Sequence, residues 1–156
     1  MSQPDDWTAS ARRVYYSLLD DWNRQNAVET AARFTERGSL VGFDGSAIDG
    51  RACIEAHLKP IFAQHPTPRF VAKVREVRRM ANGQTLLLRA VAGMWPRGAT
   101  ELEPGLTAIQ TMVLSLSDGV YRIEMFQNTP AAFHGRPEEA DKLNKELREI
   151  GKPEGA

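Results

Sequence analysis

The spacing of apolar residues changes near residue 69, from a helical period before it to strand-like alternation after it. The first helical segment, Thr8 to Asn23, has apolar residues on one face and charged residues on the other, which predicts an amphipathic helix. Asn26, followed three residues later by Glu29, is typical of a capping box at the start of a second helix. That helix is predicted to run through Phe34, with Gly38 available to end it.

A short hairpin and a third helix are predicted next. Two short strands, Ser39 to Phe43 and Ser46 to Ile48, are joined by Asp44-Gly45, a dipeptide that favours tight hairpins. Asp49 is interpreted as the cap of the following helix. Pro60 lies inside that helix, so the helix is expected to kink or to split there.

Four long strands fill the second half of the chain, and Asn82-Gly83 and Asp118-Gly119 favour hairpins between them. The predicted strands are Phe70–Met80, Gln84–Trp95, Leu106–Leu116 and Val120–Gln127. Consecutive hairpins predict an antiparallel meander, and a last helix is expected from Pro137 to about Ile150. Helices followed by such a sheet predict an α+β fold in which helices cover one face of a curved, mainly antiparallel sheet.

Length and charge narrow the class of protein. The 156 residues predict one domain over 1–156, with a core over about 8–130 and a helical extension over about 137–150. Twenty basic residues balance twenty acidic ones, so nucleic acid is not an expected partner. Met1 to Asp6 resemble no signal peptide, and no apolar run is long enough to span a membrane. Together with the single cysteine, Cys53, these features predict a soluble cytoplasmic protein.

Both faces of the predicted sheet are apolar. The strand Gln84 to Trp95 has leucine, alanine and methionine on one side, and leucine, valine and tryptophan with one arginine on the other. Because the predicted helices cover one face, the other face is expected to pack against a second copy of the chain. The sequence therefore predicts a homodimer formed through the sheet.

Two segments resemble those of a known superfamily. The segment from Phe43 to Ile54 resembles the hairpin and helix start of the cone-shaped nuclear transport factor 2-like fold, the scaffold of ketosteroid isomerase and the SnoaL-like polyketide cyclases. The segment from Tyr121 to Pro130 resembles, more specifically, the closing strand of the SgcJ/EcaC family. The resemblance covers about Thr8 to Thr129 and implies an internal pocket for a small molecule, with an apolar or polycyclic metabolite as the expected ligand.

Cofactors and metals are not predicted. Members of the SgcJ/EcaC family carry an oxidoreductase label, but no glycine-rich dinucleotide motif follows any predicted strand of this chain. The three histidines are far apart and lack the spacing of metal ligands.

The resemblance also directs attention to residues that can line the pocket. Apolar walls and a few amides are what such a pocket requires, because amides inside a sheet need hydrogen-bond partners that a ligand can supply. An equally weighted alternative is that these amides bond to the backbone. The candidate ligand-binding residues are Trp22, Phe34, Phe43, Phe62, Met94, Gln110, Met112, Gln127 and Asn128.

His57 is the candidate general base, because the unperturbed pKa of histidine lies near neutrality. The alternative for His57 is a residue on the outer face of its helix with a structural role. Three functions are compatible with the sequence: an isomerase, cyclase or hydratase acting in a dry pocket, a ligand-binding protein without chemistry, and a protein-interaction module that uses its sheet face.

Overall fold

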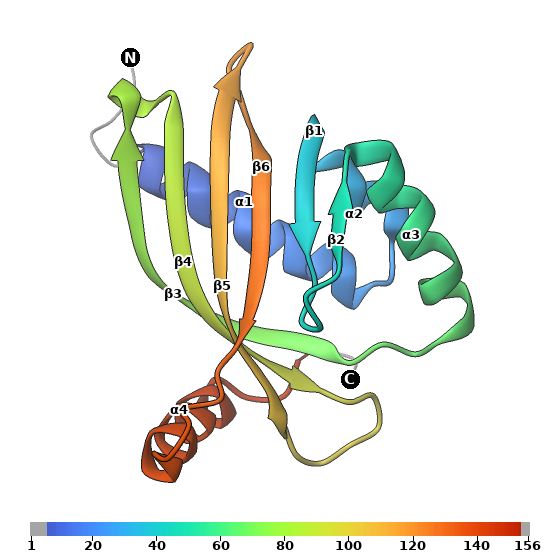
Figure 1. Ribbon diagram of the computed structural model, residues 1–156, viewed down its shortest axis with the longest axis vertical. Coiled ribbons are helices and arrows are strands. Elements are labelled where there is room, and N and C mark those ends of the chain that lie inside the picture. Colours follow the sequence, from blue (N-terminus) through green and yellow to red (C-terminus); the bar gives the residue numbers. More distant parts are fainter. Residues whose placement is uncertain (1–5, 154–156) are drawn as a thin grey trace.

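The computed structural model describes residues 6–153, so residues 1–5, on which the prediction of no signal peptide mainly rests, lie outside this range. Its elements are α1 (Asp6–Asn23), α2 (Ala27–Ala32), β1 (Phe34–Val41), β2 (Ala47–Asp49), α3 (Arg51–Gln64), β3 (Arg69–Met80), η1 (Ala81–Gly83), β4 (Thr85–Trp95), β5 (Glu103–Ser117), β6 (Val120–Pro130) and α4 (Pro137–Ile150). The strands form one curved sheet in the order β2-β1-β6-β5-β4-β3, and α1 crosses its concave face (Figure 1). This is the predicted α+β architecture.

The predicted meander is confirmed, because β3, β4, β5 and β6 pair in sequence order and antiparallel. Asp118 and Gly119 both have positive φ, at 52° and 77°, as a type I′ hairpin turn requires. Asn82 and Gly83 lie in a short 3₁₀ turn, again with positive φ. Local turn chemistry therefore favours the pairing of β3 with β4 and of β5 with β6.

The main core lies between the concave face of the sheet and α1, α2 and α3. Tyr15, Leu18 and Leu19 of α1 are buried against sheet residues such as Leu88 and Met112. These α1 positions follow the three- and four-residue spacing seen in the sequence, so the predicted apolar face is the face that packs.

The second predicted helix is wrong at its C-terminal end. Helix α2 stops at Ala32, and Phe34 begins β1, which pairs in parallel with β6 through Ile123. Gly38 lies inside this strand rather than at a helix end. A Cβ atom on Gly38 would stand 2.5 Å from the carbonyl oxygen of Ile123, so glycine is needed for the close approach of the two strands.

The start of α3 also differs from the prediction. Asp49 belongs to β2 and accepts a hydrogen bond from Ser39 Oγ at 2.7 Å, so it pairs with β1 instead of capping the helix. The N-cap of α3 is Gly50, whose φ is 97°. The helix continues from Arg51 to Gln64 as one element, with Pro60 inside it and without the predicted split.

Helix α4 covers part of the convex face of the sheet, on the side opposite α1 (Figure 1). Leu143 and Leu147 are buried against Val71, Val91 and Trp95, in a second apolar cluster. This helix corrects the premise that helices cover only one face, because the apolar residues at this end of the convex face have an intramolecular partner.

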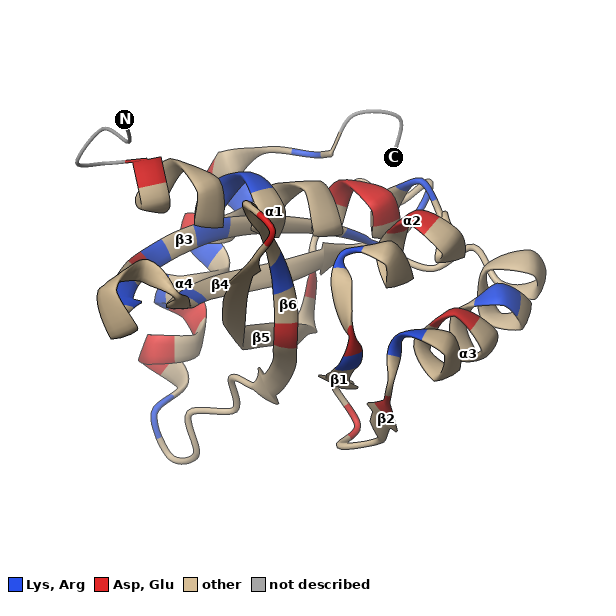
Figure 2. Cartoon of the chain, turned by 90° about the horizontal axis from the view of Figure 1, so that it is seen from above, with Lys and Arg blue, Asp and Glu red and all other residues tan. Residues whose placement is uncertain are grey.

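Charged residues of both signs occur together on the helices, as Figure 2 shows for α1 and α3. Ion pairs within a helix follow from this arrangement, for example Lys59 with Glu55 at 2.8 Å. Among the helices of residues 6–153, none combines the length and the apolar character needed to cross a bilayer.

Candidate functional site

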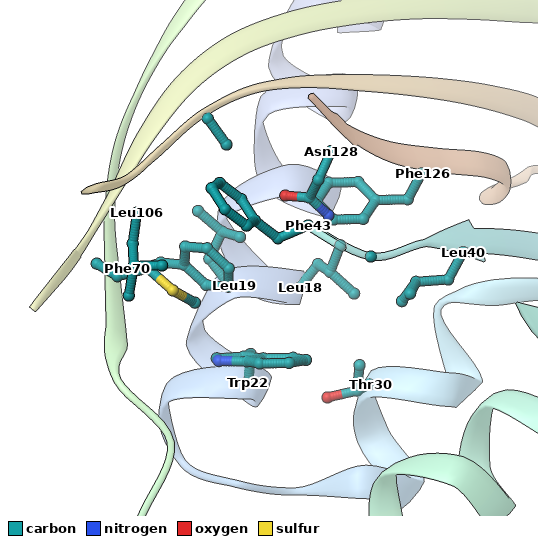
Figure 3. Close-up of a pocket in the computed structure, with 13 residues that line it drawn as sticks. Leu18, Leu19, Trp22, Thr30, Leu40, Phe43, Phe70, Leu106, Phe126 and Asn128 are labelled. Atoms are coloured by element: carbon teal, nitrogen blue, oxygen red, sulfur yellow. The ribbon is translucent and has the colours of Figure 1, made fainter. Parts of the chain in front are cut away.

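A cavity of about 170 Å³ lies inside the cone, between α1, α2 and the concave face of the sheet (Figure 3). Its walls are almost entirely apolar. The lining residues are Leu18, Leu19, Trp22, Thr30, Leu40, Gly42, Phe43, Phe70, Met94, Leu106, Ala108, Phe126 and Asn128.

Two periodicities bring these side chains together. Leu18, Leu19 and Trp22 share one face of α1, since residues three and four apart are neighbours on a helix. On the sheet, Phe126 and Asn128 are two residues apart on β6 and point to the same side, into the cavity. The strand and the helix thus present their inner faces to a common space.

Trp22 forms a fixed aromatic wall. Its indole Nε1 donates a hydrogen bond to the carbonyl oxygen of Pro68 at 3.3 Å, which sets the orientation of the ring. Phe62 packs edge-on against the ring from behind, with centroids 5.1 Å apart, and Phe70 lies 5.5 Å away at a tilt of 54°. These contacts hold the wall in place without a ligand, which lowers the entropy cost of binding.

The polar side of the cavity is a chain of hydrogen bonds that ends at Asn128. Tyr15 donates its hydroxyl hydrogen to Gln110 Oε1 at 2.6 Å. Gln110 Nε2 in turn donates to Asn128 Oδ1 at 2.9 Å, and Asn128 Nδ2 donates to the backbone carbonyl oxygen of Val41 at 3.0 Å. Gln110 is fully buried, so the chain satisfies its amide and leaves Asn128 as the member that faces the cavity.

Burial raises the pKa of Tyr15 well above its ordinary value, because the phenolate would be formed away from water. The neighbouring Tyr16 adds to this effect. The Tyr15 hydroxyl therefore remains protonated and remains a donor over the whole physiological pH range.

None of the described residues that line the cavity has a titratable side chain. The hydrogen of the Thr30 hydroxyl is already used, since it is donated to the carbonyl oxygen of Asn26 at 2.7 Å. The walls can thus enclose an apolar molecule and offer it the Asn128 amide, but they supply no side chain that takes up or releases a proton near neutral pH.

The structure brings only some of the predicted ligand-binding residues to the cavity. Trp22, Phe43, Met94 and Asn128 line it, and Phe62 supports it through Trp22. Gln110 lies one hydrogen bond behind Asn128 and does not line the cavity.

The other predicted residues lie elsewhere. Phe34 and Met112 are completely buried in the main core and line no part of the cavity. Gln127 is exposed on the convex face, because alternation along β6 directs it opposite to Phe126 and Asn128. His57 is exposed as well. Ile54 and Leu58 are buried on the side of α3 that faces the core, and His57 lies on the opposite, outer side.

Nine lining residues were not singled out from the sequence. They could have been found only with the register of each element, that is, with knowledge of which side faces inward, and the sequence alone did not give this. Once Asn128 is known to face inward, for example, alternation along the strand also places Phe126 inward. The nine are Leu18, Leu19, Thr30, Leu40, Gly42, Phe70, Leu106, Ala108 and Phe126.

Solved structures resemble this chain over most of its length. A domain of unknown function with a cystatin-like fold from Nostoc punctiforme PCC 73102 shares 25% identity, with a TM-score of 0.76 over 96% of this chain and 94% of that one. A protein of unknown function from Shewanella oneidensis MR-1, described as nuclear transport factor 2-like, shares 14% identity with a TM-score of 0.64. It covers 78% of this chain and 98% of its own. The fold is nuclear transport factor 2-like.

ActVI-ORFA from Streptomyces coelicolor has the same fold, with 17% identity and a TM-score of 0.64 over 80% of this chain and 97% of that one. The sequence matches no protein-family model and no curated protein sequence. The similarity thus establishes the nuclear transport factor 2-like fold, and the chemistry of the cavity has to be argued from its own residues.

Proposed function

We propose that this protein binds a small, uncharged, largely apolar molecule in its cone cavity and does not transform it chemically. The observation that carries the proposal is the wall composition: apolar side chains line the cavity with one amide, Asn128, and one hydroxyl, Thr30, and the described lining residues include no general acid or base. A charged ligand would lose its hydration without gaining a counter-ion there, which is costly.

The size of the cavity restricts the ligand further. A cavity of about 150 Å³ lined by apolar side chains accommodates benzene, and the present cavity measures about 170 Å³. A ligand of one ring, or of two fused rings after small adjustments of the walls, fits this space. The proposal therefore narrows the apolar or polycyclic metabolite expected from the sequence to a compact molecule.

Catalysis with His57 as base is the less favoured function, because His57 is exposed on the outer side of α3. Membership of the SgcJ/EcaC family is part of the proposal and rests on the sequence of the closing strand, Tyr121 to Pro130. That strand is β6, which contributes Phe126 and Asn128 to the cavity.

A size series of hydrocarbons tests the proposal. Binding of cumene, naphthalene and pyrene is measured by isothermal titration calorimetry or by ligand-observed NMR, at matched concentrations of protein. We expect saturable binding of cumene, weaker binding of naphthalene and none of pyrene. Equal binding of all three compounds would place the binding on an open surface and refute the proposal, as would the absence of any binding.

A homodimer through the convex face of the sheet remains a proposal. It is supported by Leu87, Val113 and Met125, which lie half-buried on that face outside the apolar cluster covered by α4. Sedimentation of a single monomeric species at micromolar concentration would contradict it, and a dimer that Val113→Lys dissociates would support it.

A reducing compartment, the cytoplasm, is proposed from the exposed lone thiol of Cys53. Nucleic acid is not a proposed partner, because charge of both signs is interspersed along the helices (Figure 2).

A further inference from the structure

We propose, building on the binding function above, that the ligand is a neutral carbonyl compound whose oxygen accepts a hydrogen bond from the side-chain amide of Asn128. The proposal follows from the direction of the hydrogen-bond chain behind the cavity, which leaves one N–H of the Asn128 amide to donate to the ligand.

The direction is set at the backbone. The carbonyl oxygen of Val41 can only accept, so the group of Asn128 that faces it at 3.0 Å has to be the nitrogen, Nδ2. The oxygen Oδ1 of Asn128 is then turned to Gln110 and receives a hydrogen from Gln110 Nε2 at 2.9 Å. Asn128 cannot rotate its amide by 180° without placing two oxygens against each other at Val41 and two N–H groups against each other at Gln110.

The far end of the chain reinforces this direction. With its Nε2 committed to Asn128, Gln110 presents Oε1 to Tyr15, whose hydroxyl donates to it at 2.6 Å. Tyr15 and Gln110 are both completely buried, so water does not compete for either group. Two side chains, Tyr15 and Gln110, and the backbone carbonyl of Val41 thus hold the Asn128 amide in a single orientation.

One hydrogen-bonding group of this amide is left over. Asn128 Nδ2 carries two hydrogens, and only the bond to Val41 is formed among residues 6–153. The amide lies at the wall of the cavity between the rings of Phe43 and Phe126 (Figure 3). A ligand with an acceptor oxygen at this wall and an apolar body toward Trp22 satisfies the second N–H, whereas a pure hydrocarbon leaves it without a partner.

Carbonyl compounds fit this wall better than alcohols or carboxylates. An alcohol adds a hydroxyl hydrogen that also needs an acceptor, and the two side-chain oxygens of the wall, Asn128 Oδ1 and Thr30 Oγ1, each already take part in a hydrogen bond within the protein. A carboxylate brings a charge that none of the described lining residues neutralises. Small ketones, aldehydes, esters and lactones are therefore the ligand class that the cavity selects.

The test compares acetophenone with cumene, which has nearly the same shape but no acceptor, in the wild type and in Asn128→Asp. The aspartate keeps the size of the side chain and an oxygen for Gln110, and it has no N–H. The titrations are repeated at increasing pH, because a protonated carboxyl group would still offer one O–H whereas the ionised form has no donor. We expect the substitution to weaken acetophenone binding about 5-fold, the loss that corresponds to one neutral hydrogen bond, and to leave cumene binding within about 2-fold. Because each ligand is compared with itself, differences in its transfer from water cancel.

Gln127→Glu is the matched control, since it makes the same amide-to-acid change on the opposite face of β6. It is expected to change neither affinity. An equal loss for both ligands in Asn128→Asp, or no loss for either, would overturn the inference while leaving the binding function standing. Failure of both ligands to bind the wild type would refute the binding function itself.

A second readout does not depend on a variant. The infrared carbonyl stretch of acetophenone bound to the wild-type protein is expected to move to lower wavenumber than in an apolar solvent, as hydrogen bonding to the carbonyl oxygen requires. A bound ligand with the band position of the apolar solvent would contradict a hydrogen bond from Asn128.

Discussion

Filling the cavity from the sheet side is expected to stabilise the protein and to abolish binding. Ala108 lies on the inner face of β5, is buried, and has its side chain at the cavity wall. Replacing it with leucine adds three carbon atoms that project into the cavity of about 170 Å³. If this space is empty, Ala108→Leu gains burial without a clash.

The gain can be estimated from transfer energies. Three carbons at about 0.8 kcal/mol each give an upper limit of about 2.4 kcal/mol, and the ordering of a leucine side chain costs about 0.5–1 kcal/mol. The net stabilisation is then about 1.5 kcal/mol, which corresponds to a rise in melting temperature of about 3–6 °C for a chain of this length.

Chemical denaturation and calorimetric titration with cumene give the two readouts. Ala90→Leu is the control, because Ala90 lies on the same face of the neighbouring strand, is completely buried and does not line the cavity. That substitution overpacks the core and is expected to cost about 1–3 kcal/mol. A loss of stability in Ala108→Leu similar to that in Ala90→Leu, or unchanged cumene binding in a stabilised Ala108→Leu, would refute the assignment of this cavity as the ligand site.

Three further predictions concern the fold and the excluded base. Gly38→Ala is expected to destabilise the protein by about 1–3 kcal/mol in urea denaturation, because its Cβ would lie 2.5 Å from a backbone oxygen of β6. Gly105→Ala, at an exposed position near the start of β5, should change the stability by no more than about 0.5 kcal/mol. Equal effects would argue against the close parallel pairing of β1 with β6. The ion pair to Arg75 lowers the pKa of Glu146 from 4.5 to about 2, so its contribution is present above pH 4.5 and is lost as the pH falls toward 2. Glu146→Gln should accordingly make the melting temperature fall less steeply as the pH is lowered over that range. An unchanged dependence of the melting temperature on pH would contradict a stabilising contribution of the Glu146–Arg75 ion pair. His57→Ala should leave ligand affinity unchanged, because His57 is exposed on the outer side of α3. A tenfold loss of affinity would show that His57 contributes to the binding site.

Local sequence signals were sufficient for much of the fold and failed where a distant segment decides the structure. The period of α1 and the hairpin dipeptides predicted the first helix and the four-stranded meander, because each of these elements is set by its own residues. Phe34 was placed in a helix, yet it begins β1, because a parallel pairing with β6, about 90 residues further along the chain, determines its conformation. Secondary-structure propensity depends on the local sequence, so it cannot predict a pairing with a strand this far along the chain.

The helix that covers the convex face also shows what the local sequence could not predict. The last helix was predicted correctly from Pro137 to about Ile150, but its sequence did not identify the surface that Leu143 and Leu147 cover. The structure places it on Val91 and Trp95, so the apolar character of that end of β4 reflects an intramolecular contact. The apolar period of a helix or strand shows which of its faces is buried, but it does not identify the element that covers that face.

The sequence predicted the chemical type of the candidate site and some of its residues. The expectation of apolar walls with amides led to Trp22 and Asn128, both of which line the cavity. Choosing between neighbours required the strand register, which separates Asn128 from the exposed Gln127. The function of Gln110 also needed three dimensions, because its two partners are 95 and 18 residues away in sequence.

A crystal structure of the protein with acetophenone bound tests the central claim most directly. The account predicts one molecule inside the cone, its ring beside Trp22 and its oxygen within about 3.2 Å of Asn128 Nδ2, the upper range for an N–H···O hydrogen bond. Acetophenone bound only outside the cone, or inside it with its carbonyl directed away from Asn128 and toward the apolar wall, would contradict the account.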